Sequence, residues 1–290
     1  MRTMKTVLCG LALAAPCAVA QSPSRDGPLL AGVALEPTAS YYFFYPAGSL
    51  RLVGWDRDSM AIHGHGNRSD FHLGRSPKGG KFFIEPAQGE TSTPIDLVVY
   101  YPRRGTVSVK AASATIVASD VSGSYSTVSG TVRLTGSVSS LEAETMDGNI
   151  DLDVNTPWLR AHTSSGHLLI RGAPQDVDAS TISGTLDIAS SAILRGRFAS
   201  VTGDIRYAAT PARGALADFS GHAGTIDFLL PRNVSGRFDL SSVTGEIANG
   251  FTEARPVASG PRRLRLSLGR GDAQFTVRTF KGTIRVRPAQ

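Results

Sequence analysis

Apolar and polar residues alternate along most of this chain, and the alternation recurs around a regularly spaced glycine. The segments ETMDGNIDL (144–152), HTSSGHLLI (162–170) and STISGTLDI (180–188) place their glycines 18 residues apart. Looser copies extend the series, which comprises Gly130, Gly148, Gly166, Gly184, Gly203, Gly224 and Gly245. A period of two is typical of β-strands, whereas a helix repeats about every 3.6 residues. The pattern predicts an all-β protein of strand–turn–strand units, with the glycine in each turn.

Three apolar columns emerge when the units are aligned on this glycine, at five residues before it and at two and four residues after it. The column two residues after the glycine reads Val132, Ile150, Leu168, Leu186, Ile205, Ile226 and Ile247. One unit cannot bury its apolar face alone, but units stacked about 4.8 Å apart bury it together. We therefore expect a β-solenoid of stacked 18–21-residue units over residues 111–288, with an open twisted sheet or a sandwich as alternatives.

The region before the repeats divides into three parts. Residues 1–20 carry Arg2 and Lys5, an apolar stretch and the small residues Ala18-Val19-Ala20, as a signal peptide does, with cleavage before Gln21. Residues 21–40 read as a linker. Residues 41–110 contain short strands without the repeat, and we expect them to form an N-terminal β module that caps the first unit. No second apolar run is long enough to span a membrane, so the pattern predicts an exported protein of the periplasm or the outer cell surface.

The positions of the two cysteines exclude several kinds of site. Both of them, Cys9 and Cys17, lie in the expected signal peptide. Without that segment the chain has no thiol, which excludes disulfides, thiol nucleophiles and zinc sites with cysteine ligands. The remaining charge is weakly basic, with 28 basic against 24 acidic residues, and the basic residues are concentrated after position 250. This asymmetry indicates an interaction surface, and nothing in it suggests nucleic acid as the partner.

Two further segments carry a family resemblance. GSLRLVGWDRDSMAIHG (48–64) and IDLVVYYPRRGTVSVK (95–110), followed by the glycine repeats, resemble a bacterial family of secreted β-strand-repeat proteins that is labelled as putative adhesins or as a domain of unknown function. The resemblance covers roughly residues 45–288. It implies a β-solenoid-like fold outside the cytoplasm and transfers no catalytic residue.

The histidines and aspartates suggest a metal site or a glycosidase site, but their spacing along the chain supports neither. His63, His65 and His72 are close in sequence, but no carboxylate stands at a compelling spacing to complete a metal site. Asp151, Asp187 and Asp227 share the position three residues after the glycine, where carboxylates could bind calcium or cleave a polysaccharide. Leu169 and Arg206 interrupt this column, which favours a solvated face. We expect no catalytic residues, no bound metal and no cofactor.

Two binding surfaces remain as hypotheses. Trp55 and the run from Tyr41 to Tyr45 could stack on a carbohydrate, although strand alternation favours packing in the core. Near the C-terminus, four arginines alternate with aliphatic residues: Arg263, Arg265, Arg285 and Arg287. If their two strands pair, directly or through residues 273–279, the arginines form a cationic patch. Such a patch protects a sheet edge from polymerisation, or it binds a polyanion.

These observations favour a non-enzymatic exported protein of the cell envelope. It would be a rigid scaffold for binding or assembly, as in adhesins, with an unidentified envelope component as its partner, either an anionic glycan or a protein. The alternative is a carbohydrate-active enzyme on a β-helix scaffold. Two carboxylates within about 10 Å in a groove would favour that alternative.

Overall fold

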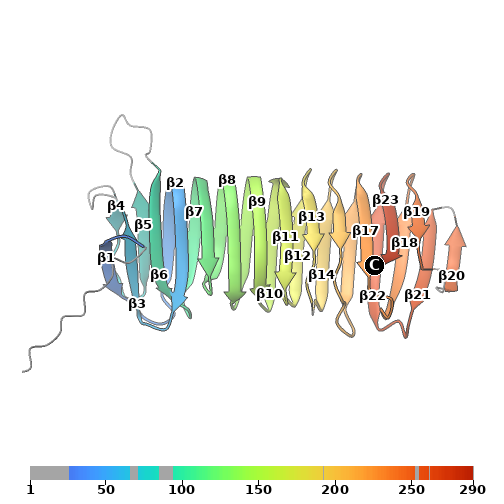
Figure 1. Cartoon of the computed structure of the whole chain (residues 1–290), viewed down its shortest axis with the longest axis horizontal. Helices are drawn as coiled ribbons and strands as arrows, with labels where there is room; N and C mark the ends of the chain where they lie inside the picture. The colour runs from blue at the N-terminus through green and yellow to red at the C-terminus, as the bar shows by residue number, and fades with distance from the viewer. Residues whose placement is uncertain are drawn as a thin grey trace, which may run out of the picture.

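The computed structural model describes residues 26–65, 71–84, 94–191, 193–251, 255–260 and 262–289, with only the backbone of 255–259. The expected signal peptide, with Cys9 and Cys17, lies outside the described residues. Every element in the described part is a β-strand, and the strands lie side by side in one long mixed array (Figure 1). No helical segment there has the length and hydropathy that a membrane crossing requires. The all-β prediction is confirmed.

The strands fall into four groups along the chain. The first six are β1 (Leu29–Ala34), β2 (Ser40–Trp55), β3 (Ser59–Gly64), β4 (Phe71–Leu73), β5 (Gly79–Ile84) and β6 (Ile95–Pro102). Three long strands each span a whole unit: β7 (Thr106–Ser119), β8 (Ser122–Ser137) and β9 (Leu141–Asn155). The next units have two strands each: β10 (Trp158–Ser165), β11 (His167–Gly172), β12 (Asp176–Thr181), β13 (Thr185–Ile188), β14 (Arg195–Ser200), β15 (Ile205–Tyr207), β16 (Leu216–Gly221) and β17 (Thr225–Leu230). The last group is β18 (Gly236–Ser242), β19 (Ile247–Asn249), β20 (Arg255–Gly260), β21 (Arg263–Leu268), β22 (Ala273–Thr279) and β23 (Thr283–Pro288).

The repeats form two parallel ladders. The first half of β9 pairs with β10 and the second half with β11, and from there β12, β14 and β16 extend the first ladder while β13, β15 and β17 extend the second. Equivalent residues of successive units lie opposite each other. Leu186, for example, lies between Leu168 and Ile205. The register that the glycine alignment predicts is therefore confirmed over these units.

The core lies between the two ladders. The predicted apolar columns are buried, and Leu186 is 0% exposed, whereas its neighbour Thr185 faces solvent. Toward the C-terminal end, aromatic rings fill the space between the ladders. Phe219 of the first ladder contacts Tyr207 and Phe228 of the second at centroid distances of 5.4 and 4.8 Å. The exceptions are Ile247, which is half-buried, and Asn249, which is exposed.

The C-terminal unit is inserted between two earlier units. Strand β22 pairs with β16 on one side and β18 on the other, and β23 lies in the same way between β17 and β19. Figure 1 accordingly places the C-terminus inside the array, with β18 to β21 beyond it. Strand β21 runs antiparallel to β18 and β20. The condition stated for a single cationic patch, that the strand at 263–266 pairs with the strand at 284–287 directly or through 273–279, is not met. Strand β21 pairs with β18 and β20, whereas β23 pairs with β17 and β19.

At the opposite end of the array a strand is likewise inserted between strands that are not its neighbours in sequence. Strand β2 lies between β7 on one side and β5 and β6 on the other, and it pairs in parallel with all three. Strands β1 and β3 pair antiparallel beyond β6, and β4 pairs antiparallel with β5. Antiparallel strands therefore cover both ends, which limits the unpaired edge that a parallel stack would expose.

The repeated glycine is required by close approach of neighbouring backbones. A Cβ atom at Gly203 would lie closer than 3.0 Å to the carbonyl oxygen of Gly184, and the same holds for Gly282 against Gly224 and for Gly245 against Gly282. A side chain at these positions would push the units apart. The glycines thus form one column, in which Gly282 follows Gly224 and precedes Gly245.

A column of buried hydroxyl groups supports these corners. Three residues before the glycine, Thr181 Oγ1 accepts a hydrogen bond from Gly184 N at 3.0 Å, and Thr163 Oγ1 donates to Ser165 O at 2.5 Å. Ser242 and Thr279 accept from their glycines in the same way. Each of these hydroxyls satisfies a backbone group that the bend removes from the ladder. Thr145 of the same column is the exception, because its buried Oγ1 has no hydrogen-bond partner among the described residues.

Candidate functional site

The outward face of the second ladder carries charges of alternating sign. Aligned three residues after the glycine are Arg133, Asp151, Leu169, Asp187, Arg206, Asp227 and Arg285. Asp151 binds the guanidinium groups of Arg171 at 2.6 Å and Arg133 at 3.4 Å, and Asp187 lies 2.7 Å from His167 Nε2. This face is paired and partly exposed, as the hypothesis of a solvated surface predicts.

One hollow on this face brings three carboxylates together. Asp187, Asp204 and Asp227 line a depression of about 260 Å³ with Arg206 and Arg285. Each carboxylate has a partner of its own: Asp227 binds Arg287 at 2.5 Å, and Asp204 accepts from Thr225 N at 2.6 Å. A glycosidase needs one carboxylic acid that keeps its proton. Asp187 and Asp227 are two strand spacings apart, or about 9.6 Å, so this hollow meets the separation stated above for the enzyme alternative. Both carboxylates are engaged by basic side chains, His167 and Arg287.

The four C-terminal arginines are not brought together. Arg263 and Arg265 lie on β21, and both bind Asp239 of β18, at 3.0 and 3.1 Å. Arg285 and Arg287 lie on β23, which belongs to the second ladder. The pKa of Asp239 is lowered, mainly by the hydrogen bond from Arg263 and to a smaller extent by that from Arg265. Burial acts in the opposite direction. Acidic neighbours therefore neutralise much of the charge that the sequence presents as a patch.

The histidines considered for metal do not form a cluster. His63 Nδ1 lies 3.2 Å from the carbonyl oxygen of Gly27, and its ring packs edge-on against Tyr100. His72 stacks on Phe83 at 4.9 Å. Within the described ranges, no three His, Cys, Asp or Glu side chains are placed to hold a metal ion together.

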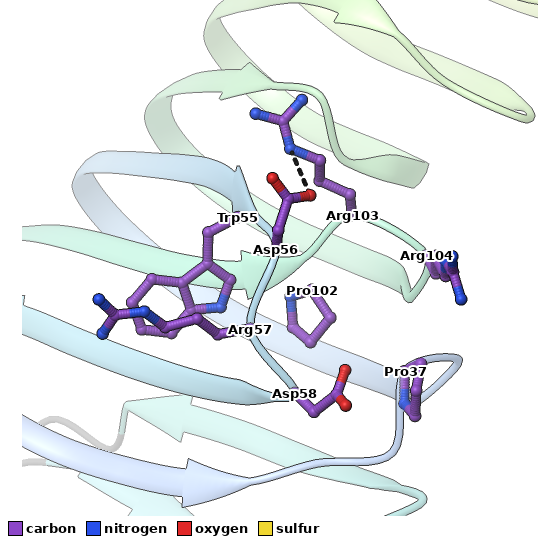
Figure 2. A pocket seen from close by; sticks show the side chains of 8 residues that line it. All are labelled: Pro37, Trp55, Asp56, Arg57, Asp58, Pro102, Arg103 and Arg104. Atoms are coloured by element: carbon purple, nitrogen blue, oxygen red, sulfur yellow. Dashed lines mark ion pairs between the residues drawn. The ribbon is translucent and has the colours of Figure 1, made fainter.

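Trp55 lines a hollow of about 260 Å³ at the end of β2, with Pro37, Asp56, Arg57, Asp58, Pro102, Arg103 and Arg104 (Figure 2). Its indole stacks on Tyr100 at 5.2 Å and has the Arg57 guanidinium 5.0 Å from its centroid. Arg103 bridges Asp56 and Asp120. Since Tyr100 and Arg57 pack on the indole, Trp55 stabilises this corner and does not present a free ring to a sugar.

The aromatic run of β2 is divided by strand alternation. Tyr41, Phe43 and Tyr45 point into the core, where the hydroxyl of Tyr45 donates to the Ile95 carbonyl. Burial raises the pKa of the Tyr45 phenol. Tyr42 and Phe44 point outward. Core packing therefore accounts for three of the five residues and leaves two for a surface.

The outward pair extends into a small, partly exposed cluster, which we call the aromatic patch: Tyr42, Phe44, His72 and Phe83. Phe44 is 55% exposed, lies 6.2 Å from Tyr42 and sits opposite Phe83 in the register of β2 and β5. Lys110 Nζ lies 5.9 Å from the Tyr42 ring. The patch joins flat apolar rings to a nearby cation, an arrangement that suits an acidic sugar polymer.

Sequence reasoning missed two parts of these surfaces. It placed neither His72 and Phe83 beside Phe44 nor Asp239 and Asp227 beside the arginines. Both omissions depend on which strands are neighbours. The pairing of β2 with β5 and that of β18 with β21 cannot be predicted from local alternation. The Phe82-Phe83 pair, with one ring necessarily outward, was the available signal for the patch.

Comparison with known proteins finds low similarity to solved structures. No family model and no curated protein sequence matches the chain. Among solved structures, a putative adhesin from Bacteroides fragilis aligns with 92% of this chain and 98% of its own, at 11% identity and a TM-score of 0.44. A putative cell adhesion protein from Clostridium sporogenes aligns with 89% of this chain and 98% of its own, at 11% identity and a TM-score of 0.23. At these scores neither similarity supports a functional conclusion.

Proposed function

We propose that this protein is a non-enzymatic, exported scaffold of the cell envelope, whose two ladders close into a β-solenoid rod. The support for the solenoid is the continuous parallel register of both ladders and the packing of their rings against each other. The N-terminal β module expected at residues 41–110 would cap one end of the rod, and β20 with β21 the other. The signal-peptide-like residues 1–20 support export, to the periplasm or the outer surface.

The binding role rests on one observation, the exposed aromatic patch. Phe44 is among the most exposed large apolar side chains of the described residues, and the rigid ladder beneath fixes it beside Tyr42 and Phe83. Rings that are already fixed by the ladder bind the apolar faces of sugars with little further loss of side-chain entropy. Lys110 would then attract carboxylate groups of the same polymer. We therefore propose an acidic envelope glycan as the ligand, in the manner of an adhesin.

Co-sedimentation with purified peptidoglycan tests this proposal. The wild-type protein should pellet with the polymer, and Phe44→Ser should weaken binding by about tenfold. Leu216→Ser is the matched control, because Leu216 is 49% exposed and lies far along the first ladder, on β16. Failure of the wild-type protein to pellet, or equal binding of the two variants, would contradict the proposal. New reducing ends in the same mixtures would favour the enzyme alternative instead.

A further inference from the structure

A second exposed apolar feature runs along the corner of the repeats, two residues before each glycine. We call it the ridge. In spatial order it contains Val128, Met146, Ser164, Ile182, Val201, His222, Phe280 and Val243. Six of these are apolar residues with 46–60% of their surface exposed, and the described part of the chain has eleven exposed large apolar residues in all. With eight positions about 4.8 Å apart, the ridge is about 34 Å long.

The position of the ridge follows from the hydroxyl column beside it. Thr145, Thr181 and Thr279 point inward, so the residues that follow them, Met146, Ile182 and Phe280, must point outward. The glycine corner does not need these residues to be apolar. Soluble monomers rarely expose a large apolar surface unless a partner covers it, and six of the eight ridge positions are exposed and apolar.

A shallow groove of about 430 Å³ accompanies the middle of the ridge. Its floor consists of small residues from the first ladder, Ser180, Ala199 and Ser220, and its wall is the ridge itself, at Ile182, Val201 and His222. A row of protruding apolar side chains beside a row of small ones is complementary to a second copy of itself that is rotated by 180°.

The order of residues along the ridge specifies this rotation. With a twofold axis between Ile182 and Val201, these two residues face each other's copies. Ser164 then faces His222, so that the two polar positions coincide. Met146 faces Phe280, and Val128 faces Val243.

The charges beside the ridge follow the same symmetry. Glu144 and Asp147 flank Met146, and Arg278 and Lys281 flank Phe280; all four are exposed, and no ion pair within the described residues engages them. The antiparallel arrangement therefore sets two acids against two bases at both ends. A parallel arrangement would set acids against acids, at a cost in repulsion.

We propose that the ridge binds a second copy of this chain, antiparallel and about a twofold axis between Ile182 and Val201. The aromatic patch lies toward the N-terminal end of the same outward face, where Phe44 and Lys110 continue the column of Ser126 and Glu144. Different substitutions therefore test the two surfaces. The ridge and groove are narrow compared with the roughly 800 Å² that each partner buries in a stable complex. The dimer should therefore be reversible and concentration-dependent.

Sedimentation velocity over a concentration series, at low ionic strength, tests the proposal on the exported chain. The wild-type protein should shift from monomer to dimer, and Ile182→Ser with Val201→Ser should weaken dimerisation by more than about tenfold. Leu216→Ser is again the control, because it removes an equally exposed side chain away from the ridge. Circular dichroism should show the fold intact in both variants. A wild-type protein that stays monomeric at all concentrations overturns the proposal.

A charge swap tests the orientation. Arg278→Glu with Lys281→Glu should abolish the dimer, and so should Glu144→Lys with Asp147→Lys. Mixing the two variants should restore dimerisation, because one variant then carries acids at both ends of the ridge and the other carries bases at both ends. The quadruple variant, with the charges exchanged, should dimerise like the wild-type protein. A quadruple variant that stays monomeric while folded would overturn the antiparallel assignment.

Discussion

The insertion of the C-terminal unit can be tested by engineered disulfides. Ser220 of β16, Arg278 of β22 and Ser241 of β18 occupy one outward column, with Arg278 between the two serines. Neighbouring strands are about 4.8 Å apart, which lies within the Cα separation of a disulfide, whereas Ser220 and Ser241 are two spacings, or about 9.6 Å, apart. Ser220→Cys with Arg278→Cys should therefore form a disulfide, and Ser220→Cys with Ser241→Cys should not.

The native cysteines should not interfere with this experiment, because the chain has two, Cys9 and Cys17, and both precede residue 21. After mild oxidation, free-thiol titration and mobility on non-reducing gels distinguish the two double variants. The bond at 220 and 278 closes a loop of about 58 residues, for which the chain-entropy model gives about 4 kcal/mol of stabilisation as an upper value. Urea unfolding with and without reductant measures it.

The reverse pattern of disulfide formation would refute the insertion of β22 between β16 and β18. If the 220 and 241 pair oxidises readily while the 220 and 278 pair keeps its thiols, the last three units stack in sequence order. The antiparallel ridge pairing would then lose its basis as well, because Ser241 and Thr244, in place of Arg278 and Lys281, would lie opposite Glu144 and Asp147.

Three further predictions concern the core, an ion-pair cluster and metals. Leu186→Asp buries an unpaired charge and should lower the free energy of unfolding by about 3 kcal/mol or more. At the exposed neighbour, Thr185→Asp should change it by less than about 0.5 kcal/mol. If urea unfolding finds equal effects for both, the assignment of inward and outward faces is wrong. The lowered pKa of Asp239 means that its stabilising effect is complete above its ordinary pKa of 3.8 and is lost as the pH falls through the lowered value. The stability difference between wild type and Asp239→Asn should accordingly shrink on acidification from about pH 6 to about pH 2, and a constant difference would contradict this. Exhaustive chelation should leave the thermal midpoint unchanged, and a fall of several degrees that one ion reverses would show a metal site.

Much of the fold was legible in the sequence because side-chain alternation is a local property. It predicted that Leu186 faces the core and Thr185 the solvent, and that Tyr42 and Phe44 cannot both share the core with Tyr41, Phe43 and Tyr45. The glycine spacing predicted the register of consecutive units from β8 to β17. Even the ridge had a signal, an apolar residue directly after an inward threonine, but single exposed apolar residues are common and do not reveal a column.

The order of the last units was decided by tertiary structure alone. Phe219, Val277 and Leu240 all suit the same core column, so alternation accepts these units in any order. In the folded protein Phe275 stacks on Phe238 at 4.5 Å and contacts Tyr207 at 5.8 Å, while β20 and β21 cover the outer edge of β18. These are contacts between segments distant in sequence, and no local pattern encodes them. They place Arg278 and Lys281 where the ridge needs bases, and they separate the four arginines that the sequence presents as one patch.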